Sequence, residues 1–112
     1  MKYFVTEEER EKSGSTCFIE FQRGAYDGRC WKEDSLCISD DLFHELRLNR
    51  LFSRVLPQFD YFGITNVSLE GFQKIKQAAE VIGSETYECI QELDDYFKDD
   101  YNVDVLFTVC GM

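Results

Sequence analysis

The chain has 112 residues, of which 44% are hydrophobic and 15% aromatic, and this content predicts one folded domain over residues 1–112. Its formal net charge of −10 excludes nucleic acid and anionic membrane surfaces as partners, because both need clustered lysine and arginine. No apolar run approaches the length of a membrane-spanning helix, and the first residues turn acidic too soon for a signal peptide.

The first third of the chain predicts short strands and turns. Residues 2–8 alternate apolar and polar side chains, which indicates a first strand, and residues 16–22 show the same two-residue period. The pair Asp27-Gly28 is typical of a hairpin turn. Residues 30–39 predict one or two further short strands around a polar break.

A helix and another strand are expected next. Ser39 or Asp40 is a suitable N-cap for a helix that runs to about Leu56. Pro57 ends it, because the residue before a proline is driven out of the helical region. The aromatic-rich segment 59–64 predicts a strand.

Two helices and a strand complete the predicted order. Ser68 caps a helix that ends at Gly83, and Ser84 caps the next helix, which extends to about residue 100. Residues 103–109 alternate again and predict a strand in the middle of the sheet. The order of elements predicts an α+β fold, a mostly antiparallel sheet with about three helices packed on one face.

The cysteines favour a reducing compartment. There are five of them, an odd number without CxxC spacing and with mostly apolar neighbours, namely Cys17, Cys30, Cys37, Cys89 and Cys110. This pattern predicts buried, reduced thiols and a cytoplasmic protein. A secreted disulfide scaffold is the alternative.

The sequence offers no specific sign of catalysis, so we expect a protein that is not an enzyme. The single histidine, His44, needs a cysteine beside it to form a nucleophilic pair. The spacings of zinc ligands are absent, and residues 99–104 lack the glycine and the closing glutamate of a calcium loop. We therefore predict no catalytic residue, no metal and no cofactor.

Residues 84–100 form the clearest amphipathic pattern in the chain. At about 100° per residue, the apolar side chains gather on one side of the helix. Five carboxylates gather on another side, at spacings of 3, 4, 3 and 4 residues, and we call them the acidic row: Glu85, Glu88, Glu92, Asp95 and Asp99. Repulsion along this row costs on the order of 1 kcal/mol in an isolated helix.

Three explanations of the acidic row fit the sequence. It is a solvated face that keeps the protein soluble, or it is neutralised by a stripe of Arg47, Arg50 and Arg54 on the first long helix, or it binds a basic partner. Tyr96 and Tyr101 lie beside the row, and tyrosines often serve as interface anchors. The predicted binding site is therefore the acidic row with these two tyrosines.

The stretch FDYFGITNVSLEGFQKIKQAA, residues 59–79, carries a resemblance to a known family. It is similar to the pattern D-Y-F-G-(I/V)-T, followed by a capped helix with an aromatic residue and I-K, of the small acidic immunity proteins of bacterial polymorphic toxin systems. These include the immunity proteins of contact-dependent growth inhibition. The whole chain also resembles them in size, acidity and order of elements.

The resemblance implies a cytosolic inhibitor that binds one cognate basic toxin domain, commonly an RNase or DNase, in a one-to-one complex. It implies no catalytic residues and does not say which residues contact the toxin. The alternative function is an acidic adaptor or assembly subunit of a cytosolic complex. A small enzyme with a carboxylate site is a third possibility.

Overall fold

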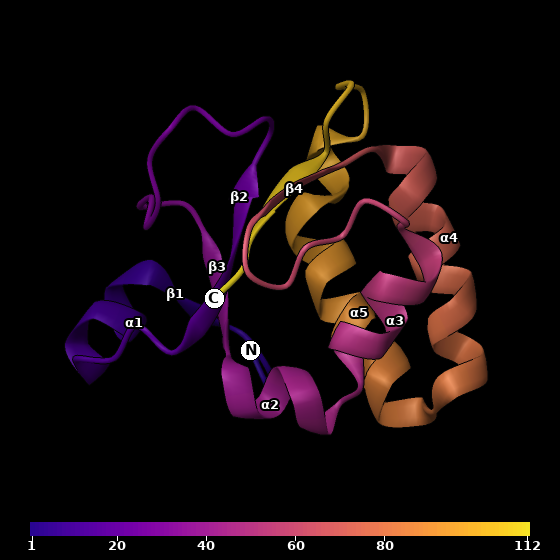
Figure 1. Ribbon diagram of the computed structural model, residues 1–112, viewed down its shortest axis with the longest axis horizontal. Helices are drawn as coiled ribbons and strands as arrows, with labels where there is room; N and C mark the ends of the chain where they lie inside the picture. The colour runs from indigo at the N-terminus through magenta and orange to yellow at the C-terminus, as the bar shows by residue number, and fades with distance from the viewer.

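The computed structural model describes residues 1–112 as one antiparallel sheet of five strands with five α-helices (Figure 1). The strands are β1 (Val5–Thr6), β2 (Phe18–Arg23), β3 (Leu36–Ser39), β4 (Ile64–Val67) and β5 (Phe107–Cys110). The helices are α1 (Glu7–Ser13), α2 (Asp40–Glu45), α3 (Leu48–Val55), α4 (Leu69–Ile82), α5 (Ser84–Phe97) and a short 3-10 helix, Lys98–Asp100. The predicted α+β class is confirmed, with five helices instead of about three.

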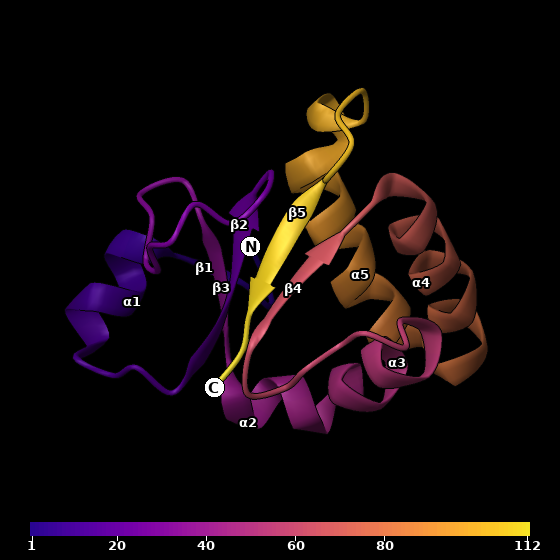
Figure 2. The ribbon, with the colours of Figure 1, turned by 45° about the horizontal axis from the view of Figure 1, so that its top comes forward.

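The sheet has the order β1-β3-β2-β5-β4, and every neighbouring pair is antiparallel. The last strand, β5, lies between β2 and β4, inside the sheet as its alternating sequence predicts. Figures 1 and 2 show α3, α4 and α5 gathered on one side of the sheet, whereas α1 lies on the other side, next to β1 and β3. None of the helices combines the length and the apolar content needed to cross a membrane.

The core lies between the sheet and the helices α3 to α5. Phe21 of the central strand is fully buried and makes edge-on aromatic contacts with Phe4, Phe52 and Phe107. The buried face of α4 contacts these aromatic residues through Phe72, which packs edge-on against Phe107 of β5. Because successive side chains of a strand point to opposite faces, the neighbours of Phe21 in β2, Glu20 and Gln22, lie on the face of the sheet opposite this core.

The predicted first strand is mostly wrong. Only two of its residues pair with β3, and Thr6 then caps α1. The Thr6 side chain accepts a hydrogen bond from the Glu9 amide, and the Glu9 carboxylate accepts one from the Thr6 amide. This reciprocal capping starts a helix where the apolar alternation indicated a strand.

The predicted helix from residue 39 to 56 is two helices. Ser39 caps α2 as expected, but Arg47 takes a left-handed conformation with φ of 60° and separates α2 from α3. The strand predicted at residues 59–64 is also misplaced, because residues 57–63 form turns and β4 begins only at Ile64.

The two predicted caps of the later helices have different outcomes. Ser68 caps α4 through a hydrogen bond from the Gly71 amide, as predicted. Ser84 does not cap α5, because Gly83 occupies the N-cap position and no side chain bonds the first turn. Between β2 and β3, Asp27-Gly28 lies within a long connection, residues 24–35, instead of a tight hairpin.

Candidate acidic interface on helix α5

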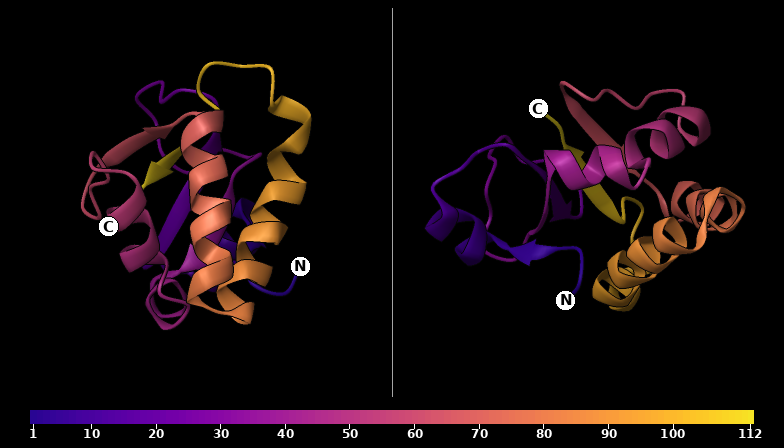
Figure 3. Two further views of the ribbon diagram at one scale, coloured as in Figure 1. Left: turned by 90° about the vertical axis from the view of Figure 1, so that its right-hand side faces the viewer. Right: turned by 90° about the horizontal axis from the view of Figure 1, so that it is seen from below.

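Helix α5 buries one face against the sheet and exposes another. Its buried residues are Thr86, Cys89, Ile90, Leu93 and Phe97. The helix packs beside α4, and Figure 3 shows α4 between α3 and α5. The side of α5 that carries the acidic row therefore faces away from the core.

Four members of the acidic row are exposed, as the prediction of a solvent-facing row requires. Glu85 and Asp99 form no ion pair, and the Asp95 carboxylate lies 3.9 Å from the Lys98 ammonium with both side chains largely exposed. Glu88 lies 3.3 Å from the ammonium of Lys2, again at an exposed position. Exposed pairs of this kind contribute little to stability and leave the carboxylates accessible.

Glu92 is the exception, because its carboxylate is engaged within the protein and is not free as the row was expected to be. Its carboxylate accepts hydrogen bonds from the backbone amides of Lys2, Tyr3 and Phe4, at 2.9, 3.0 and 2.8 Å. The N-terminal segment runs beside α5 (Figure 3), so these amides point at the helix. Glu92 anchors the N-terminus to α5 and is only half exposed.

The arginine stripe does not neutralise the acidic row. Arg47, Arg50 and Arg54 form no ion pair with any acidic residue. They line a hollow of about 290 Å³ together with Val81 and Ile82 at the end of α4. Arg47 also lines a hollow with Glu85, but because no ion pair joins these arginines to the acidic row, the explanation by internal neutralisation is wrong.

Tyr96 is held by contacts within the chain. Its hydroxyl donates to the Asp34 carbonyl at 2.8 Å, and the Arg23 guanidinium lies 4.5 Å from the centre of its ring. Arg23 also binds the Asp100 carboxylate at 2.5 Å. Tyr96 therefore joins α5 to the connection 24–35, and its ring is half exposed.

Tyr101 belongs to a second internal cluster. Its hydroxyl donates to Asp94 and lies 3.4 Å from the ammonium of Lys76, which pairs with Asp94 at 3.0 Å. Partial burial opposes the charge on Lys76, but its hydrogen bonds to Asp94 and Tyr101 outweigh that effect and raise its pKa. Both tyrosines thus border the exposed acids while their hydroxyls are engaged inside the protein.

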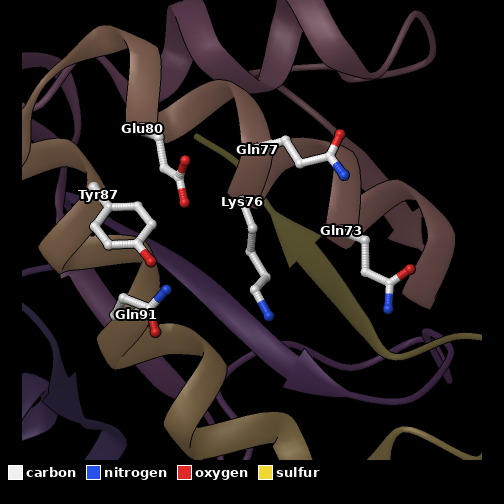
Figure 4. A pocket seen from close by; sticks show the side chains of 6 residues that line it. All are labelled: Gln73, Lys76, Gln77, Glu80, Tyr87 and Gln91. Carbon is white, nitrogen blue, oxygen red and sulfur yellow. The ribbon is translucent and has the colours of Figure 1, made fainter.

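A polar hollow of about 300 Å³ lies between α4 and α5, next to the acidic row (Figure 4). Its lining consists of Gln73, Lys76, Gln77, Glu80, Tyr87 and Gln91. Amide side chains dominate this lining, and the charge of Lys76 is balanced by Asp94. The hollow adds hydrogen-bonding groups to the surface beside the acids.

The single histidine lies in a different place. His44 Nε2 is 3.1 Å from the Tyr61 hydroxyl and 3.3 Å from the Asp40 carboxylate, and Tyr61 also donates to Asp40. Burial, followed by the contact with Asp40, raises the pKa of Tyr61 to about 12. No hydrogen bond joins His44 to a cysteine, and His44 lines none of the hollows on the surface.

One group of potential metal ligands was missed by the sequence. The Sγ atoms of Cys30 and Cys110 and a carboxylate oxygen of Glu20 lie within 4.8 Å of one another. The two oxygens of Glu20 already accept four hydrogen bonds, from the Gln22 side chain, the Trp31 and Lys32 amides and the Ser35 hydroxyl. A metal ion must therefore displace some of these donors before Glu20 can bind it.

All five cysteines are free thiols, as the sequence predicts, but only three are buried. Cys37, Cys89 and Cys110 are buried, whereas Cys17 and Cys30 are exposed.

Comparison of the chain with protein-family models, with curated proteins and with solved structures gives no match.

Proposed function

We propose that this chain is an immunity protein, a cytoplasmic inhibitor without catalytic activity that binds and neutralises one cognate basic toxin domain, an RNase or DNase. The observation that carries the proposal is the exposed surface of α5 and the 3-10 helix after it, where Glu85, Glu88, Asp95 and Asp99 face solvent without a strong internal partner. The sequence pattern at residues 59–79 supports the same family of inhibitors.

The distribution of charge supports an electrostatic mode of binding. Residues 84–104 carry eight acids and one lysine, most of the net charge of the protein. Arg50 and Arg54 line a hollow with Val81 and Ile82 at the end of α4, whereas Arg47 lines a hollow with Glu85 at the start of α5 but forms no ion pair with it. A basic cleft that binds phosphates attracts such a surface at long range, which speeds encounter and disfavours acidic competitors.

Glu92, Tyr96 and Tyr101 take a supporting part in this proposal. Their contacts fix the N-terminal segment, the connection 24–35 and the end of α5, so the exposed acids are carried on a rigid frame. Preorganisation of this kind lowers the ordering cost of association. The half-exposed tyrosine rings flank the acids as contact residues.

The direct test examines the gene immediately upstream and, if it encodes a toxin domain, uses that domain as the binding partner. We expect a one-to-one complex that protects cells producing the toxin. Reversing three unconstrained acids, Glu85→Lys, Asp95→Lys and Asp99→Lys, is expected to slow association by about tenfold or more at low salt. The measurement is the association rate by stopped flow at two ionic strengths.

A matched control separates local from global charge. The variant Glu8→Lys, Glu11→Lys and Glu33→Lys changes the net charge equally at exposed sites beside α1, away from α5. If both triple variants slow binding to the same extent, the acidic row is only a solubility surface. If the chain instead co-purifies with several housekeeping proteins and ignores the toxin, the adaptor function replaces the inhibitor function.

A further inference from the structure

Two thiols from distant parts of the chain meet on the sheet face opposite the core. Cys110 lies at the end of β5, in register with Glu20 of β2, and is buried. Cys30 belongs to the connection 24–35, which passes over this face, and is exposed. Their Sγ atoms lie within 4.8 Å of each other.

The backbone on both sides of Cys30 is fixed to the sheet. The Arg29 carbonyl accepts a hydrogen bond from the Gln22 side chain at 2.7 Å. The Trp31 amide donates to the buried carboxylate of Glu20 at 2.8 Å. Because residues 29 and 31 are both anchored to β2, Cys30 is held over Cys110 and is not carried on a freely moving loop.

The two other buried thiols, Cys37 and Cys89, are not placed to compete for Cys110. Cys37 lies on the same face of the sheet as Cys110, but β3 and β5 lie on opposite sides of β2. The backbones of β3 and β5 are therefore about 9–10 Å apart. A disulfide needs Cα atoms within about 7 Å. Cys89 is buried on α5, on the other side of the sheet.

We propose that Cys30 and Cys110 form a thiol pair that a peroxide oxidises to an intramolecular disulfide. The exposed thiolate of Cys30 attacks the O–O bond, takes one oxygen as a sulfenic acid, and the other oxygen leaves as water or alcohol. The Cys110 sulfur then attacks the Cys30 sulfur. The S–S bond forms, and the displaced hydroxide leaves as water with the proton of Cys110.

The order of the two steps follows from the environments of the thiols. Cys110 is only 4% exposed, so an oxidant in solution has little direct access to its sulfur. Cys30 is exposed and reacts first, and Cys110 resolves the product. Two thiols are oxidised and one peroxide is reduced, so no other reactant is required.

The test treats the reduced, metal-free full chain with one equivalent of hydrogen peroxide, followed by alkylation and mass spectrometry. Before alkylation we expect a mass lower by two hydrogen atoms; after it, two of the five thiols stay unalkylated, and one cross-linked peptide pair contains residues 30 and 110. Cys17→Ser removes the other exposed thiol and is expected to leave this result unchanged.

Two variants test the separate roles. Cys110→Ser is expected to abolish the cross-link and to leave a sulfenic acid on Cys30 that a selective reagent traps. Cys30→Ser, a change at an exposed position, is expected to leave the buried Cys110 reduced under the same treatment. The proposal is overturned if native protein gives the same mixture of cross-links as the urea-unfolded chain. It is equally overturned if the reduced protein binds Zn²⁺ through these two sulfurs and does not form the disulfide after the metal is removed.

Discussion

Glu92 is the residue whose role differs most from that of its neighbours in the acidic row. It accepts three backbone hydrogen bonds from the N-terminal segment. Glu92→Gln keeps the size of the side chain but removes the charge that these amides face. We expect the free energy of unfolding to fall by about 1–3 kcal/mol, measured by urea denaturation.

Glu85→Gln provides the control for this prediction, because Glu85 lies on the same helix face but is exposed and unpaired. Its effect on the free energy of unfolding is expected to stay within about 0.5 kcal/mol. Equal effects of the two substitutions would contradict the anchoring role of Glu92.

The sequence could place Glu92 on a helix face but could not identify its partners. Helical periodicity gives the angle of a side chain about the helix axis, and all five acids share that angle. The amides that bind Glu92 belong to residues about ninety positions away, and the tertiary fold alone brings them together. The same reason hid the contact between Cys30 and Cys110.

At the scale of the elements, Arg47 is the point where one expected helix becomes two. Its φ of 60° is costly for a residue with a side chain, and it makes no capping hydrogen bond through that side chain. Arg47→Gly is therefore expected to raise the free energy of unfolding by up to about 1 kcal/mol.

The matched substitution is Arg50→Gly, which removes the same charge one turn later, inside α3. Glycine in a helix interior lowers the free energy of unfolding by about 1 kcal/mol. Opposite signs for the two variants, measured by thermal and urea unfolding, support the break at Arg47. If both variants lower the free energy of unfolding, the left-handed conformation of Arg47 does not cost the stability that we infer.

Elements with long, regular patterns were predictable, and short ones were not. Helices α4 and α5 each offer about four turns of periodic apolar residues, and the predicted Ser68 cap of α4 is present. Helix α1 is short and polar. The alternation of apolar and polar residues before it indicated a strand, although Thr6 and Glu9 form a capping box that starts a helix. Within residues 59–64, Phe59 and Tyr61 pack onto the core from turns while Phe62 is exposed, and a strand pattern in the sequence cannot distinguish this arrangement.

At the scale of the whole molecule, stability at high pH depends on buried acids that must stay neutral. Cys37 is fully buried, and this burial, with nearby Glu20 adding to it, raises its pKa from 9.0 to about 12. A group whose pKa is raised by folding stabilises the protein fully below its unfolded pKa, and this contribution is lost as the pH rises. Tyr61 acts in the same direction above its unfolded value of 10.0.

We therefore expect the free energy of unfolding to fall between pH 9 and pH 10.5, with Cys37 alone accounting for about 2 kcal/mol. Cys37→Ala leaves a small cavity and lowers stability at pH 8, but it removes this titration and flattens the decline. Urea unfolding at pH 8, 9.5 and 10.5 measures both effects.

The net charge of −10 gives a second possible cause of the alkaline decline, because the molecule becomes still more negative at high pH. Salt separates the two causes, since it screens repulsion between exposed charges but does not change the cost of ionising a buried thiol. We expect the decline to persist at high salt in the wild-type chain. It is expected to shrink in Cys37→Ala but not in Cys17→Ala, which removes an exposed thiol. A decline that salt abolishes would assign the effect to surface repulsion and not to the buried thiols.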